Sequence, residues 1–153
     1  MVLIMKEEDI YKLLKFIVQR LEGIDLDWRL DGSVNLLVQG IDLQPNDLDI
    51  ATNDKGLEVF SSQFDEFISE EKLGMKFQGR SLLLEINGLE VEINSYEDDD
   101  LRKLNRIEYL SWKDLILPVL HLKEAEKFYK KIEREKKVKM IVDKLKINRE
   151  KDE

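Results

Sequence analysis

Apolar residues recur with helical spacing at four places along the chain. Between Glu7 and Glu22 they lie three and four residues apart, which predicts a helix with one buried stripe that ends at Gly23. Two further helices are predicted over about 122–133 and 136–146. Another helix is predicted to start at an Asp54 cap. Its expected apolar residues are Leu57, Phe60, Phe64, Phe67 and Ile68.

Alternating apolar and polar residues over 81–93 predict a β-hairpin. The Asn87-Gly88 pair at its centre supplies the positive φ angles that a type I′ turn requires, so the turn fixes the strand register. Ile86 is then expected opposite Leu89. One face of the hairpin is apolar, and the opposite face carries Glu85, Glu90 and Glu92.

Shorter segments complete the expected order of elements. Strands are predicted at 27–30 and 48–51, and Gly32-Ser33 opens a short helix over 34–39 that ends at Gly40. The stretch from 98 to 115 is expected to be less regular, and 116–120 to lead into a helix. One optional further strand is expected between the hairpin and the last two helices. The result is an α/β (α+β) fold with a mixed, mainly antiparallel sheet and helices packed on one face. We expect one domain over 1–153.

Length and composition exclude several kinds of site. A chain of 153 residues can bury a core without disulfides. Cysteine is absent, which excludes a disulfide framework, a thiolate zinc site and a thiol nucleophile. The one histidine, His121, is expected to be structural. The sequence shows no signal peptide and no apolar run of membrane-spanning length, so a cytoplasmic protein is expected.

Charge is distributed unevenly along the chain. The net charge is -8, yet residues 123–151 carry 12 Lys and Arg against 6 Asp and Glu. A basic helical segment over about 121–147 therefore follows an acidic body, and an acidic chain does not attract nucleic acid by bulk charge. The basic segment can face a phosphate or an acidic partner, or form a solvated helix face with paired charges.

Two aspartates of the PNDLDIAT stretch form a candidate metal site. On a strand, Asp47 and Asp49 point to one side, while the apolar residues between and after them point to the other. Glu92, on the acidic face of the hairpin, is the expected third ligand, and Glu90 is the fallback. Hard oxygen ligands of this kind suit one or two Mg²⁺ ions.

The Gly32-Ser33 turn is a candidate phosphate site. At the start of a helix the unpaired N–H groups favour an anion, Gly32 allows close backbone approach, and the Ser33 hydroxyl adds a hydrogen bond. Pairs of nearby acids are common in so acidic a chain, so the signal lies in the ordered set: turn, short helix, acid pair, then a later acid on a hairpin strand.

These motifs resemble the polymerase-beta-like nucleotidyltransferase superfamily. The resemblance rests on WRLDGS at 28–33, the glycine at position 40, DLDI at 47–50, and LPVL at 117–120 followed by a helix and REK at 134–136. The most similar members are small lincosamide and aminoglycoside nucleotidyltransferases and related minimal nucleotidyltransferases. The resemblance spans roughly residues 26–145 and is poor over 55–80.

The resemblance implies a palm-like fold and a specific activity. A nucleoside monophosphate would pass from a nucleoside triphosphate, with ATP expected, to a hydroxyl of a small molecule, a protein or an RNA end, releasing pyrophosphate. The implied residues are Asp47, Asp49 and Glu92 for Mg²⁺, and Gly32 and Ser33 for the nucleotide.

The chain departs from the family pattern at several positions. Pro45-Asn46 precedes the first aspartate, where many relatives have arginine. Lys137 stands where an aspartate is usual, and Tyr129 where a lysine is usual. The third acid is a glutamate, although an aspartate is often found there.

Two alternative functions remain open from the sequence. The chain can be an antitoxin-like or regulatory binding protein on the same fold, with a small helical toxin-like partner and weak or no catalysis. It can also be a mixed α/β domain whose acids are merely solvated. A homodimer that completes a small cleft is a further possibility.

Overall fold

The computed structural model describes residues 5–76 and 79–151 and shows helices and strands in the order that the hydrophobic pattern predicts, with additions. Each element was expected except β3, α4, β6 and the two 3₁₀ turns; the last strand, β7, falls on the segment expected only to lead into a helix. The elements are α1 (Glu7–Leu21), β1 (Trp28–Asp31), α2 (Gly32–Val38), β2 (Leu48–Thr52), α3 (Asp54–Gln63), η1 (Asp65–Phe67), β3 (Ile68–Lys76), β4 (Gly79–Ile86), β5 (Leu89–Ser95), α4 (Asp99–Arg102), η2 (Leu104–Arg106), β6 (Ile107–Trp112), β7 (Leu115–Leu120), α5 (Leu122–Lys131) and α6 (Glu135–Lys151).

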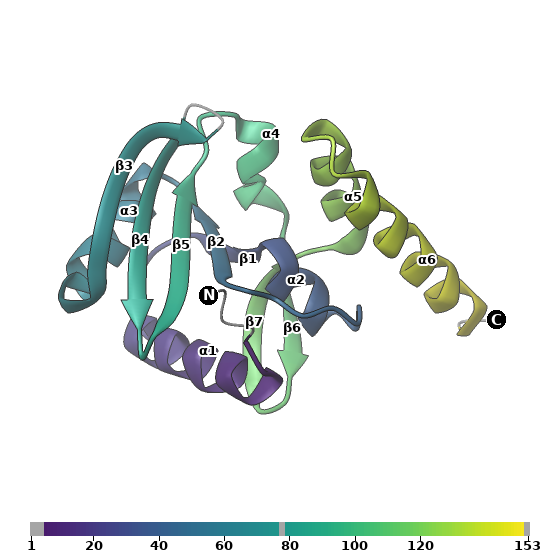
Figure 1. Cartoon of the computed structure of the whole chain (residues 1–153), viewed down its shortest axis with the longest axis horizontal. Coiled ribbons are helices and arrows are strands. Elements are labelled where there is room, and N and C mark those ends of the chain that lie inside the picture. The colour runs from purple at the N-terminus through teal and green to yellow at the C-terminus, as the bar shows by residue number, and fades with distance from the viewer. Residues whose placement is uncertain (1–4, 77–78, 152–153) are drawn as a thin grey trace.

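A five-stranded sheet in the order β1-β2-β5-β4-β3 forms the centre of the molecule (Figure 1). Only β2 and β5 run parallel, and the other neighbouring strands pair antiparallel. The prediction of a mixed, mainly antiparallel α+β fold is therefore confirmed. The parallel pair sets Asp49 directly beside Glu92.

The β4–β5 hairpin has the predicted register. Ile86 pairs with Leu89, and the turn residues Asn87 and Gly88 have φ angles of 53° and 80°. Because this register follows from two turn residues, Glu92 is placed without help from distant contacts. It lies on the face of the sheet opposite α1 and α3, which we call the outer face.

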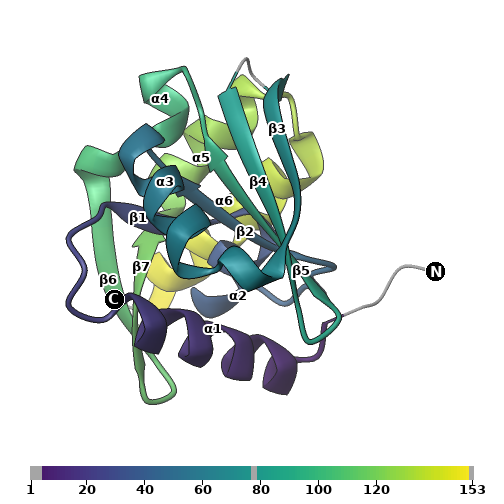
Figure 2. The same cartoon turned by 90° about the vertical axis from the view of Figure 1, so that its left-hand side faces the viewer.

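The larger hydrophobic core lies on the face of the sheet that α1 and α3 cover (Figure 2). Both helices present a stripe of apolar residues at helical spacing, and burying that stripe against the sheet is what stabilises them. The predicted packing of helices on one face of the sheet holds for α1 and α3, which lie on the same face. Fully buried residues in this core include Leu14, Ile17, Leu30, Ile50, Phe60, Phe64, Leu82 and Ile93.

A second, smaller core joins the opposite face of β2 to the C-terminal helices. Ala51 and Tyr96 pack there with Phe128 of α5 and Ile141 of α6. In the first view, α5 and α6 lie to one side of the sheet, beyond α2 (Figure 1). The basic segment predicted over about 121–147 thus falls on α5 and α6, which pack against this smaller core.

Helix α2 is fixed to strand β7 by a buried side-chain amide. Asn35 donates from Nδ2 to the Leu120 carbonyl oxygen and accepts from the Leu120 N–H through Oδ1, at 3.0 and 2.9 Å. Gln39 donates to the same carbonyl oxygen at 2.8 Å. These bonds give the start of α2 a fixed position relative to the strands beside it.

The predicted cap and extent of the helix after β2 were wrong. Asn53, not Asp54, is the N-cap, and its side chain accepts from the Gly56 N–H at 2.8 Å. The helix ends at Gln63, so Phe67 and Ile68 lie outside it. The Phe64–Phe67 spacing continues the apolar pattern, but a 3₁₀ turn follows the helix instead of another helical turn.

The stretch from 98 to 120 is more regular than expected. It contains the short helix α4 and a two-stranded ribbon of β6 and β7. Residues 116–120, expected to lead into a helix, form most of β7, and His121 then caps α5 by accepting from the Lys123 N–H. Within the described ranges, no helix combines the length and the apolar character needed to cross a lipid bilayer.

Candidate functional site

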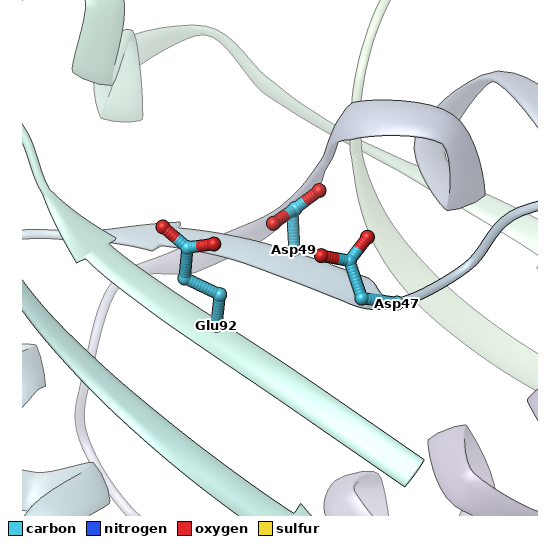
Figure 3. A group of neighbouring side chains, drawn as sticks. All are labelled: Asp47, Asp49 and Glu92. Carbon is cyan, nitrogen blue, oxygen red and sulfur yellow. The ribbon is translucent and has the colours of Figure 1, made fainter. Parts of the chain in front are cut away.

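The three predicted metal ligands lie together on the outer face of the sheet. Asp47 comes immediately before β2, Asp49 lies within it, and Glu92 is the β5 residue paired with Asp49. Their carboxylates rise from the same side of two neighbouring strands (Figure 3). One oxygen from each lies within 4.8 Å of the others, and all three side chains are partly exposed.

This arrangement has the properties of a divalent cation site. Three carboxylates at this separation repel one another unless a cation lies among them, and their oxygens are the donors that Mg²⁺ prefers. Partial exposure leaves room for water and substrate oxygens in the remaining coordination positions. The donor set therefore fits a magnesium ion.

Glu90, the fallback ligand, does not belong to this group. It shares the outer face with Glu92 but lies two residue pairs nearer the hairpin turn, opposite Glu85, and is exposed. The parallel register selects Glu92, because that residue pairs with Asp49.

Gly32 brings the backbone into contact with the acid cluster. Its φ is +60°, and a Cβ at this position would lie 2.3 Å from Asp49 Oδ2. Both facts require glycine, since the backbone conformation disfavours other residues and the carboxylate fills the space of a side chain. The turn predicted to hold a phosphate is thus adjacent to the predicted metal ligands.

The neighbouring Asp31 changes one part of the sequence-based prediction. Its Oδ1 accepts from the Gly32 N–H at 2.9 Å, so this amide at the start of α2 is occupied by the protein itself. Its Oδ2 accepts from the Tyr96 hydroxyl at 2.9 Å. Ser33 and the close backbone approach at Gly32 remain as the groups that can meet a phosphate.

A buried arginine forms an ion pair with Asp31. Arg29 is fully buried, and its Nη1 lies 3.4 Å from Asp31 Oδ1. The guanidinium also donates to the carbonyl oxygens of Leu30, Leu101 and Arg102. The last two lie at the end of α4, so one side chain neutralises Asp31 and fixes α4 beside the site. Arg29 was part of the sequence motif, but nothing in the sequence predicted this role.

Lys137 is a site residue that the sequence did not predict. From the first turn of α6 it donates to the Ser33 hydroxyl oxygen at 2.5 Å. Burial lowers the pKa of this lysine, while Asp49, Asp31 and Asp47 oppose the shift by favouring the ammonium form. Ser33 and Lys137 are 104 positions apart, and sequence patterns carry no signal for such a contact.

A cavity of about 150 Å³ lies between the Gly32 turn and the junction of α5 with α6. Acids, bases and aromatic side chains all contribute to its wall. The hydroxyl of Tyr129 is buried and has no hydrogen-bond partner among the residues that the structure describes. Burial, then the charges of Asp31 and Asp49, raise the Tyr129 pKa far above its ordinary value. The lining residues are Asp31, Gly32, Asp49, Tyr96, Phe128, Tyr129, Ile132, Arg134 and Lys137.

Comparison with solved structures identifies the fold. A candidate nucleotidyltransferase from Thermotoga maritima is similar with a TM-score of 0.73 and 25% identity, covering 93% of this chain and 96% of that one. The lincosamide antibiotic adenylyltransferase LnuA, bound to lincomycin, is similar with a TM-score of 0.60 and 14% identity over 91% and 98% of the two chains. An antigenic nucleotidyltransferase-like protein from Paracoccidioides brasiliensis gives a TM-score of 0.57 and 12% identity over 92% and 78%.

No protein-family model and no curated protein sequence matches the chain. The structural likeness covers nearly the whole chain, and it shows a polymerase-beta-like nucleotidyltransferase fold, which confirms the resemblance seen in the sequence motifs. The same neighbours support a general nucleotidyl transfer function.

Proposed function

We propose that the chain is a metal-dependent nucleotidyltransferase. It moves a nucleoside monophosphate from a nucleoside triphosphate, with ATP as the expected donor, to a hydroxyl acceptor. The acceptor oxygen forms a bond to the α-phosphorus, the bond from that phosphorus to the bridging oxygen of the β-phosphate breaks, and pyrophosphate leaves. The acceptor hydroxyl loses its proton. Residues 1–153 form one nucleotidyltransferase-like domain in this proposal.

In this function Asp47, Asp49 and Glu92 hold one or two Mg²⁺ ions. Bound magnesium supplies neutralisation of phosphate charge and a lower pKa for the attacking hydroxyl. The chain itself positions the groups: the β2–β5 pair fixes the three carboxylates on a rigid sheet, and Gly32 lets the donor phosphates approach the backbone. The Ser33 hydroxyl binds a phosphate oxygen.

One observation carries this proposal. One oxygen from each of Asp47, Asp49 and Glu92 lies within 4.8 Å of the other two, beside a glycine turn with a serine hydroxyl. Catalysis in such a site comes from positioning and charge neutralisation, so no protein nucleophile is needed. This agrees with the absence of cysteine and the structural role of the single histidine.

Calorimetry with Mg²⁺-ATP tests the proposal. We expect the wild-type protein to bind Mg²⁺-ATP, and Asp47→Asn and Asp49→Asn to bind it at least tenfold more weakly while remaining folded. Glu85→Gln is the matched control, because Glu85 is an exposed acid on the same sheet face outside the ligand group. A folded wild-type protein that does not bind Mg²⁺-ATP would refute the proposal.

The same measurement separates this function from an antitoxin-like binding role on the same fold. A regulatory binding protein would capture a helical partner equally well before and after neutralisation of Asp49. The transferase would lose nucleotide binding in that variant. Turnover can then be followed as pyrophosphate release with hydroxyl acceptors of each class: small molecule, protein and RNA end.

A further inference from the structure

The cavity between the Gly32 turn and the α5–α6 junction has features that the acid cluster does not explain. It adjoins Asp49, yet two of its lining residues are cationic: Arg134 from the junction between α5 and α6, and Lys137 from α6. Its volume of about 150 Å³ corresponds to roughly five water molecules at about 30 Å³ each, which is enough for a phosphate group.

The contact between Lys137 and Ser33 determines which way the serine hydroxyl can donate. A hydroxyl has one donor hydrogen and two acceptor lone pairs. Because the Lys137 ammonium donates to Ser33 Oγ at 2.5 Å, it uses one lone pair and leaves the O–H hydrogen available. Lys137 thereby prepares Ser33 to donate to an acceptor such as a phosphate oxygen.

Tyr129 provides an independent indication that a polar ligand enters the cavity. The residue is only 5% exposed, and within residues 5–76 and 79–151 its hydroxyl has no hydrogen-bond partner, although buried hydroxyls are nearly always hydrogen-bonded. The Lys137 ammonium lies 5.4 Å from the centre of the Tyr129 ring, so the two residues face the same space. An unpaired donor beside an ammonium is complementary to an anion.

The acids in the wall do not prevent an anion from binding there. The charge of Asp31 is balanced by Arg29, and its oxygens accept bonds from Tyr96 and the Gly32 amide. Asp49 belongs to the proposed metal site. Once that site is filled, Arg134 and Lys137 are the charges that act on the cavity.

We propose that this cavity binds a phosphate group of the nucleoside triphosphate, and that the Lys137 ammonium and the Tyr129 hydroxyl hold it. The inference rests on the proposed function and adds residues to it. The cation comes from α6, across the site from the sheet. A bound triphosphate therefore joins the sheet to the C-terminal helices.

Inorganic tripolyphosphate with Mg²⁺ is the probe, because it presents the phosphates without a nucleoside. We expect Lys137→Met to bind it at least about tenfold more weakly than wild type, the scale of a lost charge-assisted hydrogen bond. The matched control is Lys139→Met, which removes an exposed lysine of the same helix and leaves the affinity unchanged. Equal affinity of wild type and Lys137→Met, or tighter binding by the variant, would overturn the proposal.

Affinity for Mg²⁺ alone distinguishes a local effect from a damaged fold. Removing an ammonium close to Asp49 should strengthen binding of Mg²⁺ to the acids, because a competing positive charge is gone. The proposal therefore requires opposite changes in one variant, weaker for tripolyphosphate and equal or stronger for the metal. Weakening of both affinities would indicate a collapsed site and count against it.

A second variant tests Tyr129 without altering charge. Tyr129→Phe keeps the ring and removes only the unpaired hydroxyl, so thermal stability should be unchanged or raised, since the hydroxyl has no partner to lose. Tripolyphosphate affinity should fall several-fold. A purely structural tyrosine would show no change in affinity, and this outcome would remove Tyr129 from the proposal.

The results separate the two levels of inference. If wild type binds Mg²⁺-ATP and Lys137→Met binds it equally well, the proposed function stands and the role of Lys137 is refuted. If wild type binds tripolyphosphate through Lys137 but transfers no nucleotide to any acceptor, the phosphate site stands and the transferase activity is refuted.

Discussion

Three carboxylates in one row across the sheet have two contrasting environments. Asp31 on β1 pairs with Asp49 on β2, which pairs in turn with Glu92 on β5. Asp31 is 4% exposed, and its oxygens are occupied by Arg29, Tyr96 and the Gly32 amide. Asp49 and Glu92 are partly exposed and gather with Asp47.

This contrast indicates that the charged and hydrogen-bonding groups around a carboxylate, rather than its position on the sheet, determine whether it stabilises the fold or can bind a cation. A buried acid surrounded by donors supports the fold, and its removal should be felt in stability. An acid that gathers with other acids is repelled by them, and this repulsion is relieved when a cation binds among them. The four predictions that follow test this difference.

The largest expected change in stability follows the loss of Arg29, the cation paired with the buried Asp31. Arg29→Met leaves the Asp31 carboxylate buried without its cation, and the carbonyl oxygens of Leu101 and Arg102 without their donor. We expect the free energy of unfolding to fall by about 3–5 kcal/mol. Urea denaturation followed by circular dichroism measures this change.

An exposed ion pair supplies the control for that measurement. Lys12 and Glu8 form an i,i+4 pair on α1 with side chains that are 70% and 75% exposed. Lys12→Met should change the free energy of unfolding by less than about 0.5 kcal/mol. Equal losses in the Lys12 and Arg29 variants would show that burial does not distinguish the two pairs.

The next effect is a change in Mg²⁺ affinity when Asp49, one of the partly exposed acids, is neutralised. Asp49→Asn should lower the affinity for Mg²⁺ by about 100-fold, since a charged ligand of the cluster is replaced by a neutral one. The free energy of unfolding should stay the same or rise, because repulsion among the three acids is reduced. Calorimetric titration with Mg²⁺ and thermal melting test the two parts separately. A large loss of stability would place Asp49 with Asp31 as a structural acid.

Gly32 lies between the two environments and should affect both. In Gly32→Ala the added Cβ strains the left-handed backbone and collides with Asp49 Oδ2. We expect a stability loss of about 1–2 kcal/mol and Mg²⁺ affinity about tenfold lower. Gly88→Ala is the control, because its φ is +80° and, apart from Gly88 and its two chain neighbours, no described residue has an atom within 4 Å of the new Cβ. That variant should lose stability but keep its metal affinity.

Glu124 represents an intermediate environment and gives the smallest effect. Its side chain is 18% exposed, and hydrogen bonds from Lys103 and then Arg106 lower its pKa from 4.5 to about 2. Its stabilising contribution is therefore complete above pH 4.5 and is lost as the pH falls toward 2. We expect about 1 kcal/mol at neutral pH, reduced by exposure to solvent.

The measurement compares wild type with Glu124→Gln, since other carboxylates also titrate in this range. The difference between their free energies of unfolding should be constant from pH 7 to 5 and should shrink steadily below pH 4.5. A difference that did not depend on pH would show that the ion pairs of Glu124 add nothing to stability.

The features that the sequence could predict are those set by residues close together in the chain. The Asn87-Gly88 turn determined the register of β4 and β5, and strand alternation placed Asp47 and Asp49 on one face. The hairpin register then placed Glu92 on the acidic face as the expected third ligand, and the family resemblance supported the set. Each step needs only local geometry or a known motif.

The features that could not be predicted depend on contacts between distant segments. Arg29 meets the end of α4 across 72 positions and Lys137 meets Ser33 across 104. Of the β6–β7 ribbon only one optional strand was predicted, because Pro118 and the irregular polarity around it weaken the strand pattern, although burial of Leu117 and Val119 stabilises the strand. In each case tertiary packing decided the outcome.

The single parallel pairing in the sheet has a consequence for how the protein folds. β2 and β5 are about 40 residues apart in the chain and adjacent in the sheet, so their contact closes a long loop that contains α3 and the β3–β4 pair. Closing this loop has an entropic cost that local hairpins avoid. Asp49 and Glu92 should therefore come together late during refolding, after the β4–β5 hairpin has formed. During refolding, the ability to bind Mg²⁺ should then appear only once β2 has paired with β5.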